Sequence, residues 1–384
     1  MNPIDEVLTR GVAEILPSKE GLAKIMAKGP ITLYQGFDPS MPSLHLGNLV
    51  GLLKLSQFQE LGHKVIFLVG DFTGMIGDPT DKLATRKQLS PKEVKENVAK
   101  WKEQAAKVLD FEGPNPAKML FNSEWLSALS MEEFLTICAN LTVPQLIERD
   151  MFQKRLKEEG TVRVHEFLYP VLQGYDSVAM DVDLEIGGSD QIFNMLVGRT
   201  LMQAIKGKEK FVLGTKLLVD KEGNKVGKTT GNALFLDSSP ENFYAGIMSF
   251  PDTVLPLAYE LLTSFPLQGI EAKVKKEPLA EKKRLAYELV KLLWGGASAE
   301  AAQKYFERTF QERAPSFDIR VSAGESLAKT ISPYTRLESI SDAKRIIKQH
   351  AVDINGKTVS DAAYVVKVGD KIRVGERTFL IATK

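Results

Sequence analysis

A stretch of fifteen residues, Tyr34 to Asn48, constrains the fold of this chain more than any other. Its sequence is YQGFDPSMPSLHLGN. Apolar or β-branched residues begin at Ile31, and an apolar-periodic run from Leu46 to Leu61 follows the proline-punctuated loop. This order predicts a strand, a loop and a helix. Because a helix N-terminus offers unpaired N–H groups and the positive end of the helix dipole, the junction suits a polyphosphate.

A second strand and loop repeat this arrangement. Residues Lys64 to Gly70 form the run KVIFLVG without alternation, which is typical of a strand covered on both faces. A strand, a helix and a strand in this order predict a parallel sheet with a right-handed crossover. The loop from Asp71 to Lys82 then lies at the same carboxyl edge as Gly36, where doubly wound sheets bind ligands. We therefore expect an α/β fold with a doubly wound, Rossmann-like parallel sheet.

The remaining periodicities predict further elements and three domains. Helices are expected over residues 3–28, 91–109, 131–159, 165–176, 191–205, 240–310 and 341–350, and strands over residues 118–121, 182–191 and 211–213. Short β pieces follow, with turns at Asn355-Gly356 and Gly369-Asp370. Because 384 residues exceed one typical core, we expect a catalytic domain over 1–220 with a helical insertion near 125–161, a helical domain over 221–315 and a small α+β module over 316–384.

Composition excludes several classes of protein. The chain has 50 Lys and Arg against 49 Asp and Glu, so its net charge of +1 gives no global attraction to nucleic acid or membrane. A single cysteine, Cys138, excludes an intrachain disulfide and a cysteine-rich zinc site. The N-terminus lacks the regions of a signal peptide, and no apolar run reaches membrane-spanning length. We expect a cytoplasmic protein.

A second motif strengthens the first. Residues Lys225 to Thr229, KVGKT, place two ammonium groups and a hydroxyl around a glycine that lets the backbone bend close to a ligand. Taken alone, this motif can be an exposed turn, and His45 can be a helix cap or a buried histidine. Both motifs in this order, separated by a parallel α/β unit, form a strong pair.

These strings resemble a known family. HLGN, at residues 45–48, resembles the first signature of class I aminoacyl-tRNA synthetases, and KVGKT resembles the second. The strings GFDPSMPSLHLG, GDP, LQGYD and GGSDQ are similar to those of bacterial tyrosyl-tRNA synthetases, and the resemblance covers essentially the whole chain. It implies that the carboxylate of L-tyrosine attacks the α-phosphorus of ATP, giving tyrosyl-adenylate and pyrophosphate. The 2′-hydroxyl of the 3′-terminal adenosine of tRNA(Tyr) then takes the tyrosine.

The resemblance also implies a role for individual residues. Those of the chemical step would stabilise charge on the phosphates, and they are Ser40, His45, Asn48, Lys82, Arg86, Lys225, Lys228 and Thr229. The tyrosine ligands would be Tyr34, Asp78, Tyr169, Gln173, Asp176 and Gln191. The ATP site would include Gly36, Asp38, Gly47, Gly188, Asp190 and Leu218. Mg²⁺ would arrive with ATP, and the resemblance implies no protein metal site, zinc or organic cofactor.

The residue types fit these roles, although each has a simpler alternative. A phenol hydroxyl both donates and accepts, so a carboxylate at Asp176 with the hydroxyl of Tyr34 suits a tyrosine side chain. Taken singly, Asp78 can be a turn former and Asp190 a helix cap, while Asp176 and Gln173 can be a surface polar pair. Because Gln173 and Asp176 lie in an otherwise apolar helix, a place in a pocket is favoured for these two residues.

Three positions depart from the commonest family pattern. Asn48 stands where many members have a second histidine, so its share of phosphate stabilisation is open. Gln35 and Ser40 stand where cysteine and threonine are frequent, and both keep a polar group.

The resemblance extends to RNA binding and assembly. The helical region over 240–310 matches the anticodon-recognition domain, and the insertion over 131–161 matches the dimer contact, which implies a homodimer. The terminal module resembles a small RNA-binding domain shared with a ribosomal small-subunit protein. Its basic residues would contact phosphates, and they are Lys344, Arg345, Lys348, Lys357, Lys371, Arg373 and Arg377. A solvated face balanced by nearby aspartates is the alternative for any one of them.

Two other functions compete with that of an active tyrosine ligase. A catalytically silent RNA-binding relative is expected to lose Asp190 or the lysines of KVGKT, and all of these are present. A tryptophan-specific relative needs to bind an indole, which only donates, so Tyr34 with Asp176 favours a phenol.

Overall fold

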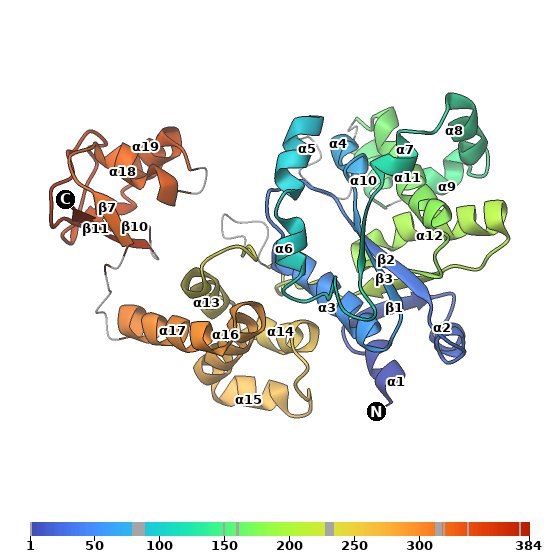
Figure 1. Cartoon of the computed structure of the whole chain (residues 1–384), viewed down its shortest axis with the longest axis horizontal. Coiled ribbons are helices and arrows are strands. Elements are labelled where there is room, and N and C mark those ends of the chain that lie inside the picture. Colours follow the sequence, from blue (N-terminus) through green and yellow to red (C-terminus); the bar gives the residue numbers. More distant parts are fainter. Residues whose placement is uncertain are drawn as a thin grey trace. The chain divides into compact units, whose positions relative to one another are not determined.

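The computed structural model describes the chain apart from residues 1, 79–88, 149, 159–160, 227–233, 312–316, 318, 336–337 and 376–377. It contains two compact units (Figure 1). The first consists of Met1–Ser238 and Phe250–Leu285, and the second of Ser239–Ser249 and Ala286–Lys384. The domain boundaries expected at residues 220 and 315 stay predictions.

A six-stranded sheet forms the centre of the first unit (Figure 1). In spatial order its strands are β1 (Val12–Leu16), β6 (Phe211–Thr215), β5 (Leu184–Gly188), β2 (Thr32–Phe37), β3 (Lys64–Val69) and β4 (Lys118–Phe121). Neighbours are parallel except β1, which is antiparallel to β6. Because β3 and β4 lie on one side of β2 while β5 and β6 lie on the other, the strand order reverses between β2 and β5. This confirms the predicted doubly wound sheet and places its switch point at the pair Tyr34 and Glu185.

Helices cover both faces of this sheet, which is why its central strands are almost wholly apolar. Val65, Phe67 and Val69 of β3 are each at most 2% exposed. The crossover after β2 is α3 (Leu46–Glu60), and α11 (Val164–Met180) packs on α12 (Ile192–Leu201). Further helices of this unit are α1 (Pro3–Val7), α2 (Lys19–Met26), α4 (Thr73–Ile76), α5 (Pro91–Val98), α6 (Trp101–Ala105), α7 (Ser123–Leu126), α8 (Met131–Cys138), α9 (Val143–Ile147), α10 (Asp150–Lys157), α14 (Leu255–Leu262) and α15 (Ile270–Lys276).

The single helix predicted over residues 3–28 is wrong. The chain forms α1, then the edge strand β1, then α2. Gly11 adopts a φ of 66°, a left-handed conformation that ends the helical path and that glycine adopts without strain. β1 then gains a ladder with β6, which a local periodicity cannot reveal. The helix predicted over 91–109 is likewise divided into α5 and α6, because the backbone leaves the helical conformation at Lys100.

The second unit combines helices with a small mixed sheet. Its helical part contains α13 (Pro240–Met248), the end of α16 (Pro278–Trp294) and α17 (Gly296–Phe306). The sheet has the order β7 (Ile319–Ser322), β11 (Thr378–Thr383), β10 (Lys371–Val374), β8 (Val352–Ile354) and β9 (Lys357–Thr358), and α18 (Leu327–Ile331) packs with α19 (Ile340–Lys348).

The predicted α+β character of the terminal module is confirmed. Asn355 and Gly356, with φ angles of 51° and 78°, form the predicted turn between β8 and β9. Arg377 lies outside the described residues. Within the described ranges of both units, every helix is too short or too polar to span a bilayer.

Candidate active site

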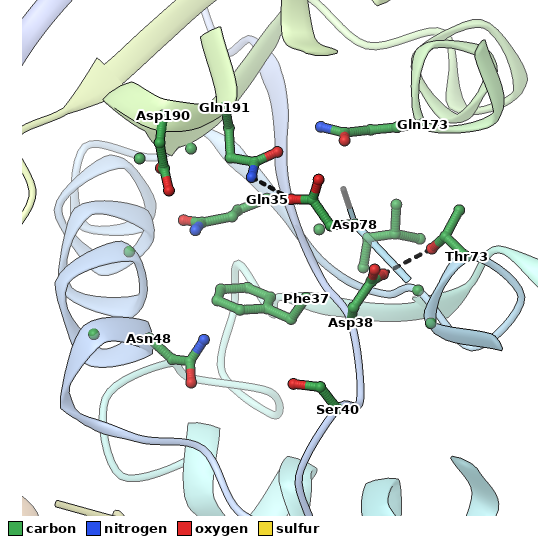
Figure 2. Close-up of a pocket in the computed structure, with 18 of the residues that line it drawn as sticks. Gln35, Phe37, Asp38, Ser40, Asn48, Thr73, Asp78, Gln173, Asp190 and Gln191 are labelled. Atoms are coloured by element: carbon green, nitrogen blue, oxygen red, sulfur yellow. Dashed lines mark hydrogen bonds between the residues drawn. The ribbon is translucent and has the colours of Figure 1, made fainter. Parts of the chain in front are cut away.

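A cavity of about 330 Å³ opens at the carboxyl ends of β2 and β5, beside the start of α3 (Figure 2). Of the twenty site residues predicted above, four lie outside the described residues, and they are Lys82, Arg86, Lys228 and Thr229. The other sixteen all line this cavity, and they are Tyr34, Gly36, Asp38, Ser40, His45, Gly47, Asn48, Asp78, Tyr169, Gln173, Asp176, Gly188, Asp190, Gln191, Leu218 and Lys225. The structure therefore brings together residues that are up to about 190 positions apart, because parallel strands share one carboxyl edge.

The start of α3 is held by a reciprocal cap between His45 and Asn48. The backbone N–H of Asn48 donates to His45 Nδ1 at 3.2 Å, and the backbone N–H of His45 donates to Asn48 Oδ1 at 2.9 Å. The helix-cap alternative for His45 thus holds, and it is compatible with a role in the cavity. Since Nδ1 accepts, a neutral His45 ring carries its proton on Nε2. Figure 2 shows Asn48 pointing from α3 into the cavity, and Oδ1 in the cap fixes its amide as a donor to that side.

Asp38 follows β2 and is held from two sides. Its Oδ1 accepts from Thr73 Oγ1 at 2.7 Å (Figure 2), and its Oδ2 accepts from the Tyr169 hydroxyl at 2.7 Å. Burial raises the pKa of Asp38 to about 7, and the negative charges of Asp78 and Asp71 add to the rise while the two hydrogen bonds oppose it. This carboxyl therefore titrates near neutral pH at the centre of the cavity.

Asp176 and Tyr34 lie together at the buried end of the cavity. Asp176 is 2% exposed, and its oxygens accept from Trp125 Nε1 at 2.8 Å and from Asn122 Nδ2 at 3.2 Å. Burial raises the pKa of Asp176 well above its ordinary range, although both hydrogen bonds oppose the rise. The Tyr34 hydroxyl lies 2.8 Å from Ser177 Oγ. A phenol can donate to a carboxylate and accept from a carboxylic acid, so this end matches a phenol in either state of Asp176.

A chain of amide hydrogen bonds connects further residues that line the cavity. Gln191 Nε2 donates to Asp78 Oδ2 at 2.5 Å (Figure 2). The Asn194 amide donates to Gln191 Oε1 at 2.9 Å and to Gln173 Oε1 at 3.0 Å, and Gln173 Nε2 donates to Glu185 Oε1 at 3.0 Å. Three of the predicted tyrosine ligands, Asp78, Gln173 and Gln191, are thus held in one connected network.

The second signature enters the cavity through Lys225. Its Nζ lies 2.7 Å from Asp190 Oδ2, and the side chains are 39% and 25% exposed. The Val226 N–H donates to the Leu218 carbonyl at 2.9 Å, which closes a turn over exposed residues such as Lys221. The exposed-turn alternative therefore describes the tip of this loop, while the segment after the tip brings the ammonium group of Lys225 to the cavity.

Two sequence families cover this chain. Residues 26–311 match the sequence model of tRNA synthetases class I (W and Y), and residues 335–372 match that of the S4 domain. The chain belongs to the class I tRNA synthetases of this W and Y family.

Individual synthetases resemble the chain along almost its full length. The tyrosine–tRNA ligase of Carboxydothermus hydrogenoformans is 39% identical, with 98% of this chain and 96% of the relative covered. Tyrosine–tRNA ligase 2 of Vibrio cholerae is 40% identical, with 98% and 97% covered. A structure of a C-terminally truncated mitochondrial tyrosyl-tRNA synthetase from Aspergillus nidulans superposes with a TM-score of 0.70 at 23% identity, covering 80% of this chain and 94% of that one. At this identity the structural likeness shows the fold alone.

Sequence reasoning missed several residues that line this synthetase cavity or hold the residues that line it. Asn122 is fully buried and joins Asp176 to Thr73, to whose Oγ1 it donates at 3.0 Å. It follows β4, so the edge argument that found Gly36 could also have found it. No comparable sequence signal marks Trp125 or Ser177. The partner of Trp125 is Asp176, which is distant in the chain, and either hydroxyl can be the donor between Ser177 and Tyr34.

The three departures from the synthetase pattern all face the cavity. Gln35 Oε1 is buried, and it has no hydrogen-bond partner among the described residues. A buried amide oxygen without a partner is unfavourable, so a ligand donor at this place would satisfy it. Ser40 keeps a hydroxyl at the wall opposite Asp190 in Figure 2.

Proposed function

We propose that this protein is a tyrosine–tRNA ligase, which activates L-tyrosine with ATP and transfers it to the 3′-terminal adenosine of tRNA(Tyr). The observation that carries the proposal is the buried carboxyl of Asp176 beside the Tyr34 hydroxyl at the closed end of the cavity. Such a pair can both accept from and donate to a phenol hydroxyl, whereas an apolar side chain would bury the Asp176 carboxyl without adding a hydrogen bond to it. The relatives named above are themselves called tyrosine–tRNA ligases.

The proposed tyrosine would lie with its phenol at Asp176 and Tyr34 and its ammonium group at the amide network. Asp78, Tyr169 and Gln173 would accept from that ammonium group, and their places in one wall of the cavity support this. Gln191 would stand near the carboxylate. In this pose the carboxylate faces the start of α3, where the phosphates of ATP would bind.

Adenylate formation then depends on orientation and charge. The tyrosine carboxylate is already ionised, so no general base is needed, and catalysis rests on donors aimed at the phosphates. The Asn48 amide, a proton on His45 Nε2, the Ser40 hydroxyl and the Lys225 ammonium group would supply them. Asp190 would take the ribose. Mg²⁺ would be held by the ATP phosphates, and within the described residues no cluster of three or more His, Cys, Asp or Glu could hold a metal.

Pyrophosphate exchange into ATP tests this function directly. With tyrosine, tryptophan or phenylalanine as the only amino acid, we expect exchange with tyrosine alone. Exchange with tryptophan alone would select the tryptophan-specific alternative, and no exchange with any of the three would support a catalytically silent relative.

The titration of Asp38 predicts that tyrosine affinity depends on pH. Below pH 7 the carboxyl of the free protein is largely protonated, and above pH 7 it is negative, because its pKa is about 7. A bound ammonium group near Tyr169 favours the negative form. Tyrosine affinity should therefore rise about tenfold from pH 6 to pH 8, measured by calorimetry. Asp38→Asn should flatten the profile, and an equally steep profile in that variant would refute the assignment.

The terminal module is proposed to bind tRNA. It matches the S4 domain, and Lys344, Lys348 and Lys357 are exposed on it. Arg345 and Arg373 instead form ion pairs with neighbouring aspartates, at 2.6 and 2.5 Å, so the balanced-face alternative describes them better. The salt dependence of tRNA affinity should therefore weaken more in a variant of Lys344 and Lys348 than in a variant of the two arginines, since each removes two charges. A ligase that uses ATP and tRNA also fits the cytoplasm, which fractionation of cells would check.

A homodimer is proposed from exposed apolar side chains on the insertion. Met131 and Leu135 of α8 and Val143 of α9 are 72%, 60% and 69% exposed, and Val164 at the start of α11 is 76% exposed. The helices α8 and α11 are in contact, and large apolar side chains exposed on neighbouring elements favour an interface. Sedimentation should show a dimer, and Leu135→Glu with Val143→Glu should shift it to a monomer. A wild-type monomer at all concentrations would contradict the proposal.

A further inference from the structure

A buried ion pair lies directly beneath the proposed tyrosine site. Lys210, which precedes β6, is 0% exposed, and Glu185 of β5 is 1% exposed. The ammonium group contacts the carboxylate and also donates to the Met195 carbonyl at 3.1 Å. Because burying two charges removes them from water, such a pair adds little to stability compared with apolar side chains of similar size. Because Glu185 lines the cavity, the pair instead suggests a role in the site.

The helix above this pair leaves room for the ammonium group. A Cβ atom at Gly198 of α12 would lie 2.6 Å from Lys210 Nζ and 2.9 Å from Ser177 Oγ, so a larger residue here would displace the ammonium group or the hydroxyl. Burial lowers the pKa of Lys210, and the charge of Glu185 opposes that shift. The surrounding chain thus leaves space for the lysine side chain beside Glu185.

Glu185 supports side chains from both ends of the proposed tyrosine site. Gln173 Nε2 donates to Oε1 of Glu185 at 3.0 Å. The Ser177 hydroxyl donates to Oε2 at 3.4 Å, and Ser177 Oγ lies 2.8 Å from the Tyr34 hydroxyl. The first hydrogen bond holds Gln173, which is proposed to bind the ammonium group. The second leads through Ser177 to Tyr34, which is proposed to bind the phenol.

The charge of Glu185 fixes which atom Gln173 offers to a ligand. An amide side chain can present either its oxygen or its NH₂ group, whereas an ionised carboxylate only accepts. Glu185 therefore holds the NH₂ group of Gln173 and turns its oxygen to the other side, where Asn194 Nδ2 donates to it at 3.0 Å. An amide oxygen has two lone pairs, so one remains for the ammonium group of a substrate.

We propose that Glu185 and Lys210 are a positioning pair, which makes Gln173 present its oxygen to the amino group of tyrosine. Lys210 is the ion-pair partner that holds Glu185 in place, and Glu185 sets the direction of the amide. The inference rests on the proposed function, because it assumes that tyrosine binds with its ammonium group at Gln173.

The test replaces both charges at once with apolar side chains of similar length, in Glu185→Met with Lys210→Met. Removing the pair together avoids a single uncompensated charge, so the variant should fold, which its Tm would show. Two ligands are then compared by equilibrium binding, tyrosine and 3-(4-hydroxyphenyl)propionate, which is tyrosine without the amino group. We expect tyrosine affinity to fall about tenfold, as for a lost hydrogen bond to a charged group. The affinity of the desamino ligand should change less than about twofold, because the phenol end loses only the long bond from Ser177, at 3.4 Å. In exchange kinetics, KM for tyrosine should rise while KM for ATP stays.

The control is Lys54→Met. Lys54 is also a buried lysine, but it donates to the carbonyls of Val7 and Arg10, at 2.9 and 2.8 Å, and does not line the cavity. This variant should bind both ligands as the wild type does.

Two results would overturn the proposal. One is an unchanged affinity for tyrosine in the double variant, and the other is an equal loss for both ligands, which would indicate a general change of pocket shape. If the double methionine variant does not fold, Glu185→Gln with Lys210→Gln keeps a neutral hydrogen-bonded pair and should show the same selectivity with a smaller loss. Failure of the wild type to exchange pyrophosphate with tyrosine would refute the proposed function instead, independently of these variants.

Discussion

Replacing Asp176 with alanine is expected to lower kcat/KM for tyrosine in pyrophosphate exchange by roughly 10²-fold or more. The change removes the carboxyl that would pair with the phenol hydroxyl. It also leaves the N–H groups of Trp125 and Asn122, now at 2.8 and 3.2 Å from the Asp176 oxygens, without their acceptor in a buried place. A lost hydrogen bond to a charged group contributes about 1.5 to 3 kcal/mol, and an unpaired buried donor contributes about 1 to 3 kcal/mol.

The same change should largely abolish discrimination against phenylalanine. Tyrosyl-tRNA synthetases as a class are already known to reject phenylalanine by a factor of about 10⁵. With the carboxyl absent, the site no longer offers the phenol hydroxyl a partner that phenylalanine cannot use, so the ratio of the two kcat/KM values should fall by several powers of ten. Asp183→Ala is the matched control, because Asp183 accepts from the Thr32 N–H at 2.8 Å at the opposite edge of the sheet. Unchanged discrimination in Asp176→Ala would refute the phenol pocket.

Much of the site could be predicted from the sequence because its residues follow consecutive parallel strands. The carboxyl ends of β2, β3 and β5 meet at one edge, so segments near Gly36, Asp78 and Gly188 had to lie close together once the sheet was recognised. The helix after β2 was evident from its apolar period, and its polar start followed from the need to cap it.

Contacts between distant segments could not be predicted in this way. β1 is a strand because β6, about 200 residues away, offers a free edge. Local spacing holds no record of such an edge, so Val12 to Leu16 resembled a helix. Trp125 escaped for a related reason, since its importance comes from a carboxyl on α11 that it reaches only in the folded chain.

Of the buried pair beneath the site, only Glu185 could have been singled out from the sequence. Glu185 stands in the run Leu184 to Gly188, which is otherwise apolar or glycine, and a charged residue in a covered strand needs a partner. The sequence could have raised that question. It could not have pointed to Lys210, which is one of many lysines and is selected only by the register between β5 and β6.

Replacing Lys225 with methionine is expected to lower the rate of adenylate formation by about 10²- to 10³-fold, the effect of losing one donor aimed at developing charge. In the free protein the Lys225 ammonium group is paired with Asp190, at 2.7 Å. If the ribose of ATP takes Asp190, binding draws that carboxylate away from the lysine, and the ammonium group can then neutralise the departing pyrophosphate. The loss should therefore appear in kcat of exchange more than in KM for tyrosine.

The neighbouring lysine of the same turn provides the control for this prediction. Lys221 is exposed and does not line the cavity, so Lys221→Met should keep the wild-type rate. Asp190→Asn separates the two halves of the argument, because it removes the proposed ribose acceptor and keeps the ammonium group. That variant should raise KM for ATP and change kcat less than Lys225→Met does. If Lys225→Met raised only KM for ATP and kept kcat, the lysine would bind ATP equally in the ground and transition states, and its proposed part in the chemical step would be wrong.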